Sequence, residues 1–208
     1  DIKDIINNVQ YIYISHEHPD HFSPNFFLDH EFKNILLNKK VKILFQETLD
    51  KRIVNFFKKN GLETIEIKAN KVLKINKNLE INIVKFGYID SALIVKSFNH
   101  KILNLNDSPL NKDSEIYKFK KKYGTFDTLL TQFSYAAWKG GKNNYNFRKQ
   151  AALEKLETIK KQSNILECSS VIPFASFIYF SNEMNKYMND NINNPEDVYK
   201  KMISEKNI

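Results

Sequence analysis

Apolar and polar positions along the first 61 residues alternate between strand and helix spacings. The expected elements are strands at Gln10–Ile14 and Val41–Phe45 and helices at Ser23–Asn38 and Leu49–Asn60. The first strand is a β-branched and aromatic run, as a buried strand requires. Ser23-Pro24 is typical of a helix start, with a serine cap and a proline in the first turn. Gly61 is typical of a helix end.

From about Thr64 to Asp107 the pattern changes to consecutive short strands, with a hairpin turn expected at Asn99-His100. The elements expected after it are helix Ser114–Tyr123, strand Thr128–Gln132, helix Phe147–Gln162, strand Ile165–Phe174 and a final helix opened by Asn194-Pro195. Repeats and linkers are absent from the sequence. We therefore predict one layered α/β domain over residues 1–208.

A histidine cluster follows directly after the first predicted strand, in the run His16-Glu17-His18-Pro19-Asp20-His21. Histidines two positions apart at a strand exit project to the same side, so His16 and His18 can hold one ion. Asp20 and His21 lie just beyond and can ligate a second. Nitrogen ligands suit zinc or iron, and zinc, iron and manganese all tolerate the carboxylate. The cluster therefore predicts a metal site on a loop at a strand end.

A second candidate ligand is Asp107, which ends the apolar strand Lys101–Asp107 and precedes Ser108-Pro109. Its carboxylate is expected at the same edge of the sheet as the histidines. The alternative is an ordinary cap of a turn or helix.

The run Tyr13–His21 resembles the His-x-His-x-Asp-His signature of the metallo-β-lactamase superfamily. Within that superfamily the chain most resembles the metallo-domain of CMP-N-acetylneuraminate hydroxylases. The stretches Asp90–Val95, Lys101–Asp107 and Pro173–Phe177 support the likeness. It implies an αββα sandwich of the metallo-β-lactamase type.

The resemblance also implies a ligand set for two divalent ions. His16 and His18 would hold the first ion, Asp20 and His21 the second, and Asp107 would bridge them. Zinc is the preferred ion, with iron and manganese as alternatives.

Two features depart from the family pattern. The superfamily's two further histidines are absent near Phe86-Gly87-Tyr88 and near Ser181-Asn182-Glu183. One stable ion, or a weaker and exchangeable pair, is therefore expected rather than a tight pair. Only about ten residues precede Tyr11, so we expect the N-terminal strands to be missing or supplied by another polypeptide.

Composition limits the partners. The net charge of +8 favours an anionic small-molecule substrate, and because the lysines are spread along the whole chain, nucleic acid is disfavoured. The single cysteine, Cys168, excludes an internal disulfide and favours the cytoplasm. It also excludes the Rieske cluster of the hydroxylases, which needs two cysteines and two histidines. No apolar run is long enough to predict a membrane helix.

Three functions remain open. In a metallo-hydrolase, the preferred reading, a metal-bound hydroxide attacks the substrate while Asp20 or Asp107 orients it or moves its proton. An iron- and oxygen-dependent hydroxylase would need electrons from another polypeptide. A non-catalytic descendant would use the fold for binding alone.

Overall fold

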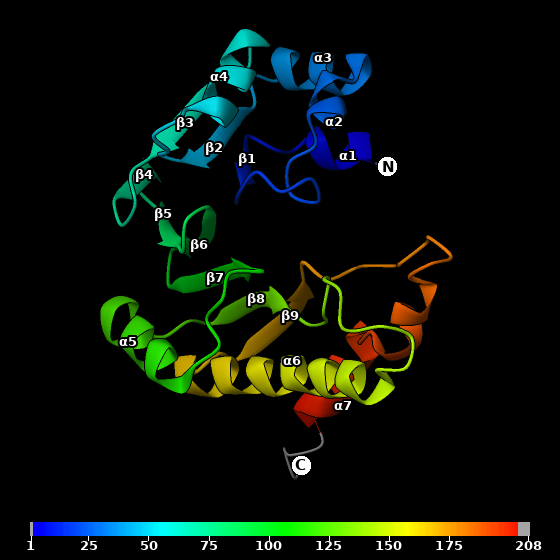
Figure 1. Cartoon of the computed structure of the whole chain (residues 1–208). Helices are drawn as coiled ribbons and strands as arrows, with labels where there is room; N and C mark the ends of the chain where they lie inside the picture. Colours follow the sequence, from blue (N-terminus) through cyan, green and yellow to red (C-terminus); the bar gives the residue numbers. More distant parts are fainter. Residues whose placement is uncertain (1, 204–208) are drawn as a thin grey trace. The chain divides into compact units, whose positions relative to one another are not determined.

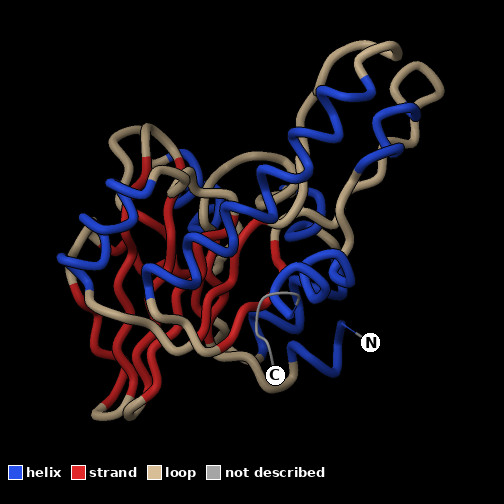
Figure 2. The backbone as a smooth tube through the Cα atoms, turned by 90° about the horizontal axis from the view of Figure 1, so that it is seen from below, coloured by secondary structure: helices blue, strands red, loops and turns tan. Residues whose placement is uncertain are grey.

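The computed structural model describes residues 2–203, and the chain divides into two compact units. The N-terminal unit ends at Val95 and the C-terminal unit begins at Lys96. Each unit contains both helices and strands (Figures 1 and 2), as the sequence pattern predicts. The single domain expected over residues 1–208 stays a prediction, and residues 1 and 204–208 lie outside the described part.

The N-terminal unit contains a small parallel sheet in the order β1-β2-β3. Its elements are α1 (Ile2–Ile6), β1 (Tyr11–Ile14), α2 (Pro24–Leu28), α3 (His30–Asn38), β2 (Lys42–Gln46), α4 (Arg52–Lys59), β3 (Thr64–Ile67), β4 (Val72–Asn76), β5 (Leu79–Phe86) and β6 (Asp90–Ser97). Strand β4 pairs antiparallel with β5, and β6 follows β5 in the same sheet. Parallel and antiparallel pairing therefore occur together in this unit.

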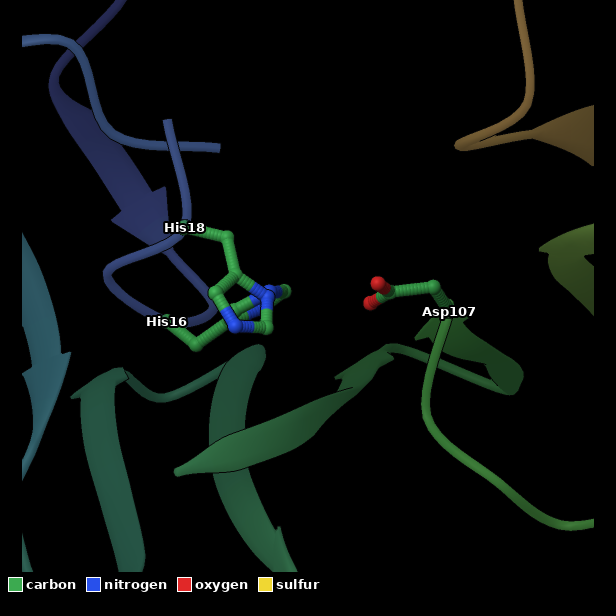
Figure 3. Close-up of side chains that lie close together, drawn as sticks. All are labelled: His16, His18 and Asp107. Atoms are coloured by element: carbon green, nitrogen blue, oxygen red, sulfur yellow. The ribbon is translucent and has the colours of Figure 1, made fainter. Parts of the chain in front are cut away.

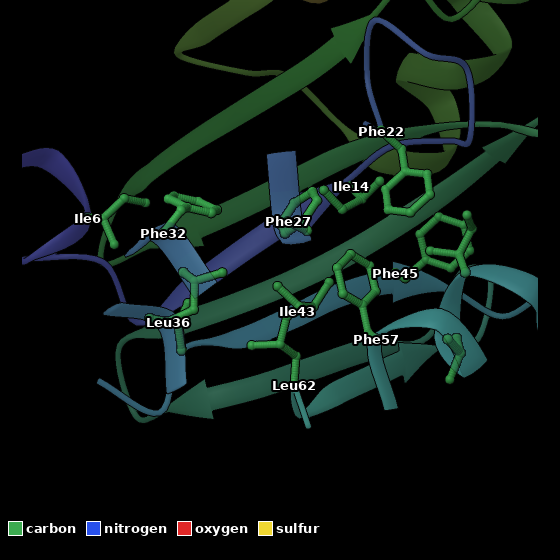
Figure 4. Packing of buried hydrophobic residues seen from close by; sticks show 13 residues of the cluster. Ile6, Ile14, Phe22, Phe27, Phe32, Leu36, Ile43, Phe45, Phe57 and Leu62 are labelled. Atoms are coloured by element: carbon green, nitrogen blue, oxygen red, sulfur yellow. The ribbon is translucent and has the colours of Figure 1, made fainter. Parts of the chain in front are cut away.

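The central strand β2 is buried on both of its faces. Ile43 and Phe45 belong to the apolar cluster formed with the helices (Figure 4), whereas Leu44 belongs to the cluster formed with β5 and β6. Successive side chains of a strand point to opposite faces, so one short apolar run supplies both clusters. This explains why the run has no polar position between Ile43 and Phe45.

The helix-side cluster depends on a group of phenylalanine rings. Phe57 on α4 is fully buried, and its ring centroid lies 4.9 Å from that of Phe27 and 5.5 Å from that of Phe22. Both contacts are edge-on, a geometry that aromatic pairs favour. Phe57 therefore joins α4 to the segment that follows the histidine cluster.

The C-terminal unit is built on three parallel strands in the order β7-β8-β9. Its elements are β7 (His100–Asn106), α5 (Asp113–Tyr123), β8 (Thr128–Gln132), α6 (Tyr145–Leu166), β9 (Ser170–Phe174), the 3-10 helix η1 (Lys186–Asn191) and α7 (Pro195–Ile203). The long helix α6 runs alongside these strands (Figure 1) and packs on α5, β8, η1 and α7. Among the helices of residues 2–203, none combines the length and the hydropathy needed to cross a membrane.

A buried arginine organises one end of this unit. Arg148 on α6 is 1% exposed, and two of its guanidinium nitrogens donate to the Asp190 carboxylate at 2.6 and 2.8 Å. It also donates to the carbonyls of Gly141 and Lys142. These bonds satisfy the buried guanidinium and fix the glycine-containing loop and η1 to α6.

The helix expected over Ser23–Asn38 is two helices in the structure. Pro24 occupies the first turn of α2 as predicted, but the Ser23 side chain makes no capping hydrogen bond. The chain breaks at Asp29, whose Oδ1 accepts a hydrogen bond from the amide of Phe32 and so caps α3. The helical spacing of apolar residues continues across Asp29, so the sequence pattern did not indicate that a second helix begins there.

Two further expectations need correction. The strand expected to begin at Ile165 begins at Ser170, because α6 continues to Leu166 and ends at Glu167 with a φ of 58°. A short apolar run does not by itself distinguish a strand from the last turn of a buried helix. The hairpin turn lies at Phe98-Asn99, one residue earlier than expected.

We predict that Phe57→Ala lowers the free energy of unfolding by about 3–5 kcal/mol, because it removes a fully buried ring from the helix-side cluster. Chemical denaturation measures the change. The matched control is Phe147→Ala on α6, where the ring is 55% exposed and the expected change is within about 0.5 kcal/mol. Equal effects of the two substitutions would contradict this description of the core.

Candidate metal centre

The histidine cluster leaves the carboxyl end of β1 on a tight loop. The amides of His21 and Phe22 both donate to the carbonyl of His18, at 2.9 and 2.8 Å. This turn reverses the chain directly after Pro19. His16, His18 and His21 therefore gather at one strand end, where open α/β sheets place their sites.

The imidazole rings of the cluster lie close together. His16 Nε2 is 2.8 Å from His18 Nδ1, and the two ring centroids are 4.5 Å apart. The His21 ring is 4.2 Å from that of His16. His16 is 1% exposed, whereas His18 is exposed to solvent. The buried imidazole can hold an ion in a fixed position, and the exposed imidazole lies where an ion can enter from solvent.

The nitrogen pair fits a divalent ion with little adjustment. Two nitrogens on one tetrahedral zinc stand about 3.3 Å apart, given zinc–nitrogen bonds of about 2.05 Å. The observed 2.8 Å is a hydrogen-bond distance, so about half an ångström of separation would admit an ion. His18 is exposed and its ring has room to make this movement.

Ser15 positions the rings from behind. Ser15 is 4% exposed, and its hydroxyl oxygen lies 3.1 Å from the Nδ1 atoms of both His16 and His21. A hydrogen bond at one ring nitrogen orients the other nitrogen, as in many metal sites. Ser15 thus holds His16 with Nε2 directed toward His18.

Asp20 lies beside His21, as the sequence predicts, but it is much more exposed. Asp20 Oδ2 is 3.5 Å from His21 Nε2, and the side chains are 70% and 12% exposed. An exposed carboxylate next to the cluster can bind an ion or exchange a proton with water. Glu17 takes neither role, because its carboxylate is bound by Arg52.

Strand β6 adds a carboxylate that the sequence analysis did not single out. Asp90 Oδ1 lies 3.9 Å from His16 Nε2, and the side chain is 25% exposed. The sequence pattern indicated an absent histidine at residues 86–88. The sequence signal for Asp90 is a carboxylate two positions farther along, at the start of a strand.

Asp107 follows β7 in the C-terminal unit. Asn106 has a φ of 54°, and its amide donates to Asn104 Oδ1 at 2.9 Å, next to an irregularity in the β7–β8 register. The amide of Ser108 then donates to the Leu105 carbonyl. This bulge and turn put Asp107 at the carboxyl end of the strand, partly exposed, as the sequence predicts. Figure 3 shows Asp107 after β7, and His16 and His18 after β1.

A lysine near Asp107 also went unnoticed in the sequence. Lys155 on α6 donates to Gln132 Oε1, at the end of β8. Burial lowers the pKa of Lys155, the Lys139 charge lowers it further, and the Asp107 carboxylate opposes both. Lys155 lies in a lysine-rich helix, so the sequence offers no means of separating it from its solvated neighbours.

The two remaining histidines are exposed and have other neighbours. His30 opens α3 and is exposed beside Asn34. His100 opens β7, exposed, with Nε2 3.1 Å from the Thr128 hydroxyl. Both lie on the surface, as the sequence analysis expected.

Comparison with known proteins rests on structure alone, because no family model and no curated protein matches the chain. CmlA, a diiron β-hydroxylase from Streptomyces venezuelae, is similar with a TM-score of 0.64 and 13% identity, over 95% of this chain and 42% of CmlA. The metallo-β-lactamase fold protein YhfI from Bacillus subtilis is similar with a TM-score of 0.55 and 13% identity, over 89% of this chain and 72% of YhfI.

Human tRNase Z, short form, is similar with a TM-score of 0.51 and 12% identity, over 81% of this chain and 73% of that protein. The chain therefore spans about two fifths of the length of CmlA and about three quarters of the other two. At these identities the likeness concerns the fold. The finer resemblance to CMP-N-acetylneuraminate hydroxylases stays a prediction. The chain has an α/β metallo-β-lactamase-like fold, with mixed sheets and flanking helices.

Proposed function

We propose that the protein is a metal-dependent enzyme of hydrolase type that acts on an anionic small molecule. The observation that carries the proposal is the His16–His18 pair. Its two ring nitrogens lie 2.8 Å apart at the exit of a strand and are oriented by Ser15. The metallo-β-lactamase-like fold supports the proposal, but a fold alone does not assign a reaction.

The proposed ligands of the first ion are His16, His18 and Asp107, the set that the sequence resemblance implies, and two imidazoles with a carboxylate suit a divalent metal. Asp90 is proposed as a further carboxylate ligand, in place of the histidine absent at residues 86–88, since it lies 3.9 Å from His16 Nε2. Two imidazoles with carboxylates form a donor set that zinc and iron both accept. A second, more exchangeable ion would use His21 and the exposed Asp20.

An ion bound there would lower the pKa of a coordinated water towards about 7 and polarise the substrate. The chain's own residues would do the rest. Asp20 is exposed enough to take a proton from water and release it to solvent, and Asp107 would hold the attacking water in place. Lys155 would offer its side-chain amine as a hydrogen-bond donor to an anionic substrate.

A second candidate function is an iron- and oxygen-dependent hydroxylase. Similarity to the diiron β-hydroxylase CmlA over 95% of this chain is the observation that favours it. His16 and His18 with a carboxylate would serve iron as well as zinc. This chain has one cysteine and cannot build a Rieske cluster, so we propose that electrons would come from another polypeptide.

We expect His16→Ala to weaken metal binding by at least about 100-fold, because even an outer-shell partner of a metal ligand contributes about 10–100-fold. Competition against a chelator measures the affinity. The matched control is His30→Ala, which removes an exposed histidine on α3 and should leave the affinity unchanged. Equal affinities for both variants would refute a site at the histidine pair.

Asp107→Ala tests the proposed ligand from the C-terminal unit. We expect a loss of metal affinity comparable to that of His16→Ala, since each change removes one direct ligand. Asp113→Ala removes an exposed carboxylate at the start of α5 and should bind metal as the wild type does. Full affinity in Asp107→Ala would limit the site to residues of the N-terminal unit.

The identity of the ion separates the two enzyme functions. In protein purified without contact with an affinity metal, we expect zinc, measured by elemental analysis, and hydrolysis of anionic nitrophenyl esters that a chelator abolishes. Iron with consumption of molecular oxygen would instead support the hydroxylase. Failure of zinc, iron and manganese to copurify or rebind would favour a non-catalytic role.

A further inference from the structure

The start of α6 carries positive charges that no neighbour neutralises. Residues 138–149, which comprise the loop before α6 and its first turn, include Lys139, Lys142 and Lys149 and no acidic residue. None of these three lysines forms an ion pair with a residue in the part of the chain that the structure describes. Cations beside the start of a helix face the positive end of its dipole, which does not favour them. Stability of the helix therefore does not explain these charges, and an anionic partner would.

A second lysine-rich segment does have an explanation within the fold. Lys120, Lys121 and Lys122 lie in the last turn of α5, where cations complement the negative end of the helix dipole. Lys120 also pairs with Glu167 at 2.7 Å. The lysines of α5 therefore provide a comparison for those at the start of α6.

Three aromatic side chains of residues 138–149 are exposed to solvent. Trp138 is 69% exposed, Tyr145 49% and Phe147 55%. Exposed aromatic groups that gather in one segment are typical of a surface that binds a partner. Tyr145 and Phe147 are two positions apart in α6, so their side chains leave the helix axis about 200° apart. A partner that contacts both rings reaches both sides of the helix start.

The loop that carries Trp138 is held in a fixed position. Arg148 donates to the carbonyl of Gly141 at 2.7 Å, and the Tyr187 hydroxyl donates to the carbonyl of Gly140 at 3.1 Å. The segment that leads to η1 lies at the same end of α6 (Figure 1). A binding surface that is already ordered loses less conformational entropy when its partner binds.

The helix start itself has amides that an anion can use. Asn144 precedes the first turn of α6, but its Oδ1 accepts a hydrogen bond from the amide of Gly141 at 2.9 Å and does not cap the helix. The first amides of a helix without a side-chain cap are open to water or to an anion such as a phosphate.

These features together fit a single strand of nucleic acid. Its phosphates pair with lysines and with the open amides of a helix start. Its bases stack on exposed aromatic rings, and its flexible backbone lets them reach both sides of a helix. A bilayer surface is flat and covers one side, and its apolar interior would leave the open amides unpaired. A small anion is not large enough to cover three rings.

We propose that residues 138–149 form a binding surface for single-stranded nucleic acid. The lysines of the segment contact the phosphates, and its three exposed rings stack on bases. The lysines spread along the whole chain do not favour nucleic acid by themselves. The combination of unpaired cations with exposed rings distinguishes this segment from them. The surface goes beyond the proposed enzyme function and does not depend on a metal.

Trp138 is the only tryptophan in the sequence, so the tryptophan fluorescence of the protein reports on this surface. The test titrates the full chain, without added metal, with oligo(dT) and with oligo(U) of about 12 nucleotides. We expect both to quench the emission of Trp138, because a base stacks on its ring. The logarithm of the binding constant should fall with the logarithm of the salt concentration with a slope of about −2, as contacts with about three cations predict.

Substitutions locate the surface. Trp138→Ala should weaken binding about 10-fold, measured by the anisotropy of a labelled oligonucleotide, since loss of one stacked ring has an effect of this size. Lys142→Glu should weaken binding and make the salt slope shallower. The matched control is Tyr117→Ala, which removes a ring that is 59% exposed on lysine-rich α5 and should bind as the wild type does.

Unchanged emission on titration, or equal losses of affinity in Trp138→Ala and Tyr117→Ala, would overturn the proposal. A blue shift of the emission with phosphatidylglycerol vesicles, without a response to either oligonucleotide, would assign the surface to a membrane instead. The titration of the wild type needs no variant, so it remains decisive if a variant does not fold. Metal binding is measured separately, so failure of the nucleic-acid surface and failure of the metalloenzyme are distinguishable.

Discussion

The main-chain carbonyl of Ser15 is the acceptor on which the geometry of the cluster depends. It takes a hydrogen bond from the Ser91 hydroxyl at 2.6 Å and another from Gln46 Nε2 at 3.3 Å. These three residues lie at the end of β1, the end of β2 and the start of β6. The Tyr13 hydroxyl adds a bond from β1 to the Ser91 carbonyl. The first residue of the loop that carries the histidines is therefore bonded to residues of β2 and β6 as well as continuing from β1. A loop without these bonds would not keep its ligands aligned.

Gln46 supports this loop from the end of β2. Its Nε2 donates to the carbonyl that precedes His16 and also to the carbonyl of Ile89, so one amide joins β2 to the histidine loop and to the turn before β6. The side chain is 2% exposed, so a substitution that removes the amide would leave both carbonyls without this donor.

The sequence predicted most of the element order because the buried strands and the long helices have strong apolar spacings. Strand β8 at Thr128–Gln132 was predicted to the residue. Errors occurred where local chemistry overrode the spacing, at the Asp29 cap and at the last turn of α6. The histidine motif was found because its residues are adjacent in the chain.

The other residues of the candidate site were harder to find for the opposite reason. Asp90 and Gln46 come near the cluster only through the pairing of strands far apart in sequence, and neither has a distinctive neighbour. The sequence around Lys155 does not distinguish it from the other lysines of α6, and only the structure shows that it is largely buried. Single-sequence reasoning detects such residues only when it also knows which strand ends meet.

The Ser15 hydroxyl lies 3.1 Å from the Nδ1 atoms of both His16 and His21, and its proton affects which ring nitrogens are available to an ion. A hydroxyl carries one proton. If it donates that proton to one ring, this ring must carry its own proton on Nε2 and cannot offer that nitrogen to an ion. Both rings can offer Nε2 together only when both Nδ1–H groups donate to the oxygen and the hydroxyl proton turns to a third acceptor. The orientation of the Ser15 O–H bond therefore decides whether one imidazole or both imidazoles can serve as ligands through Nε2.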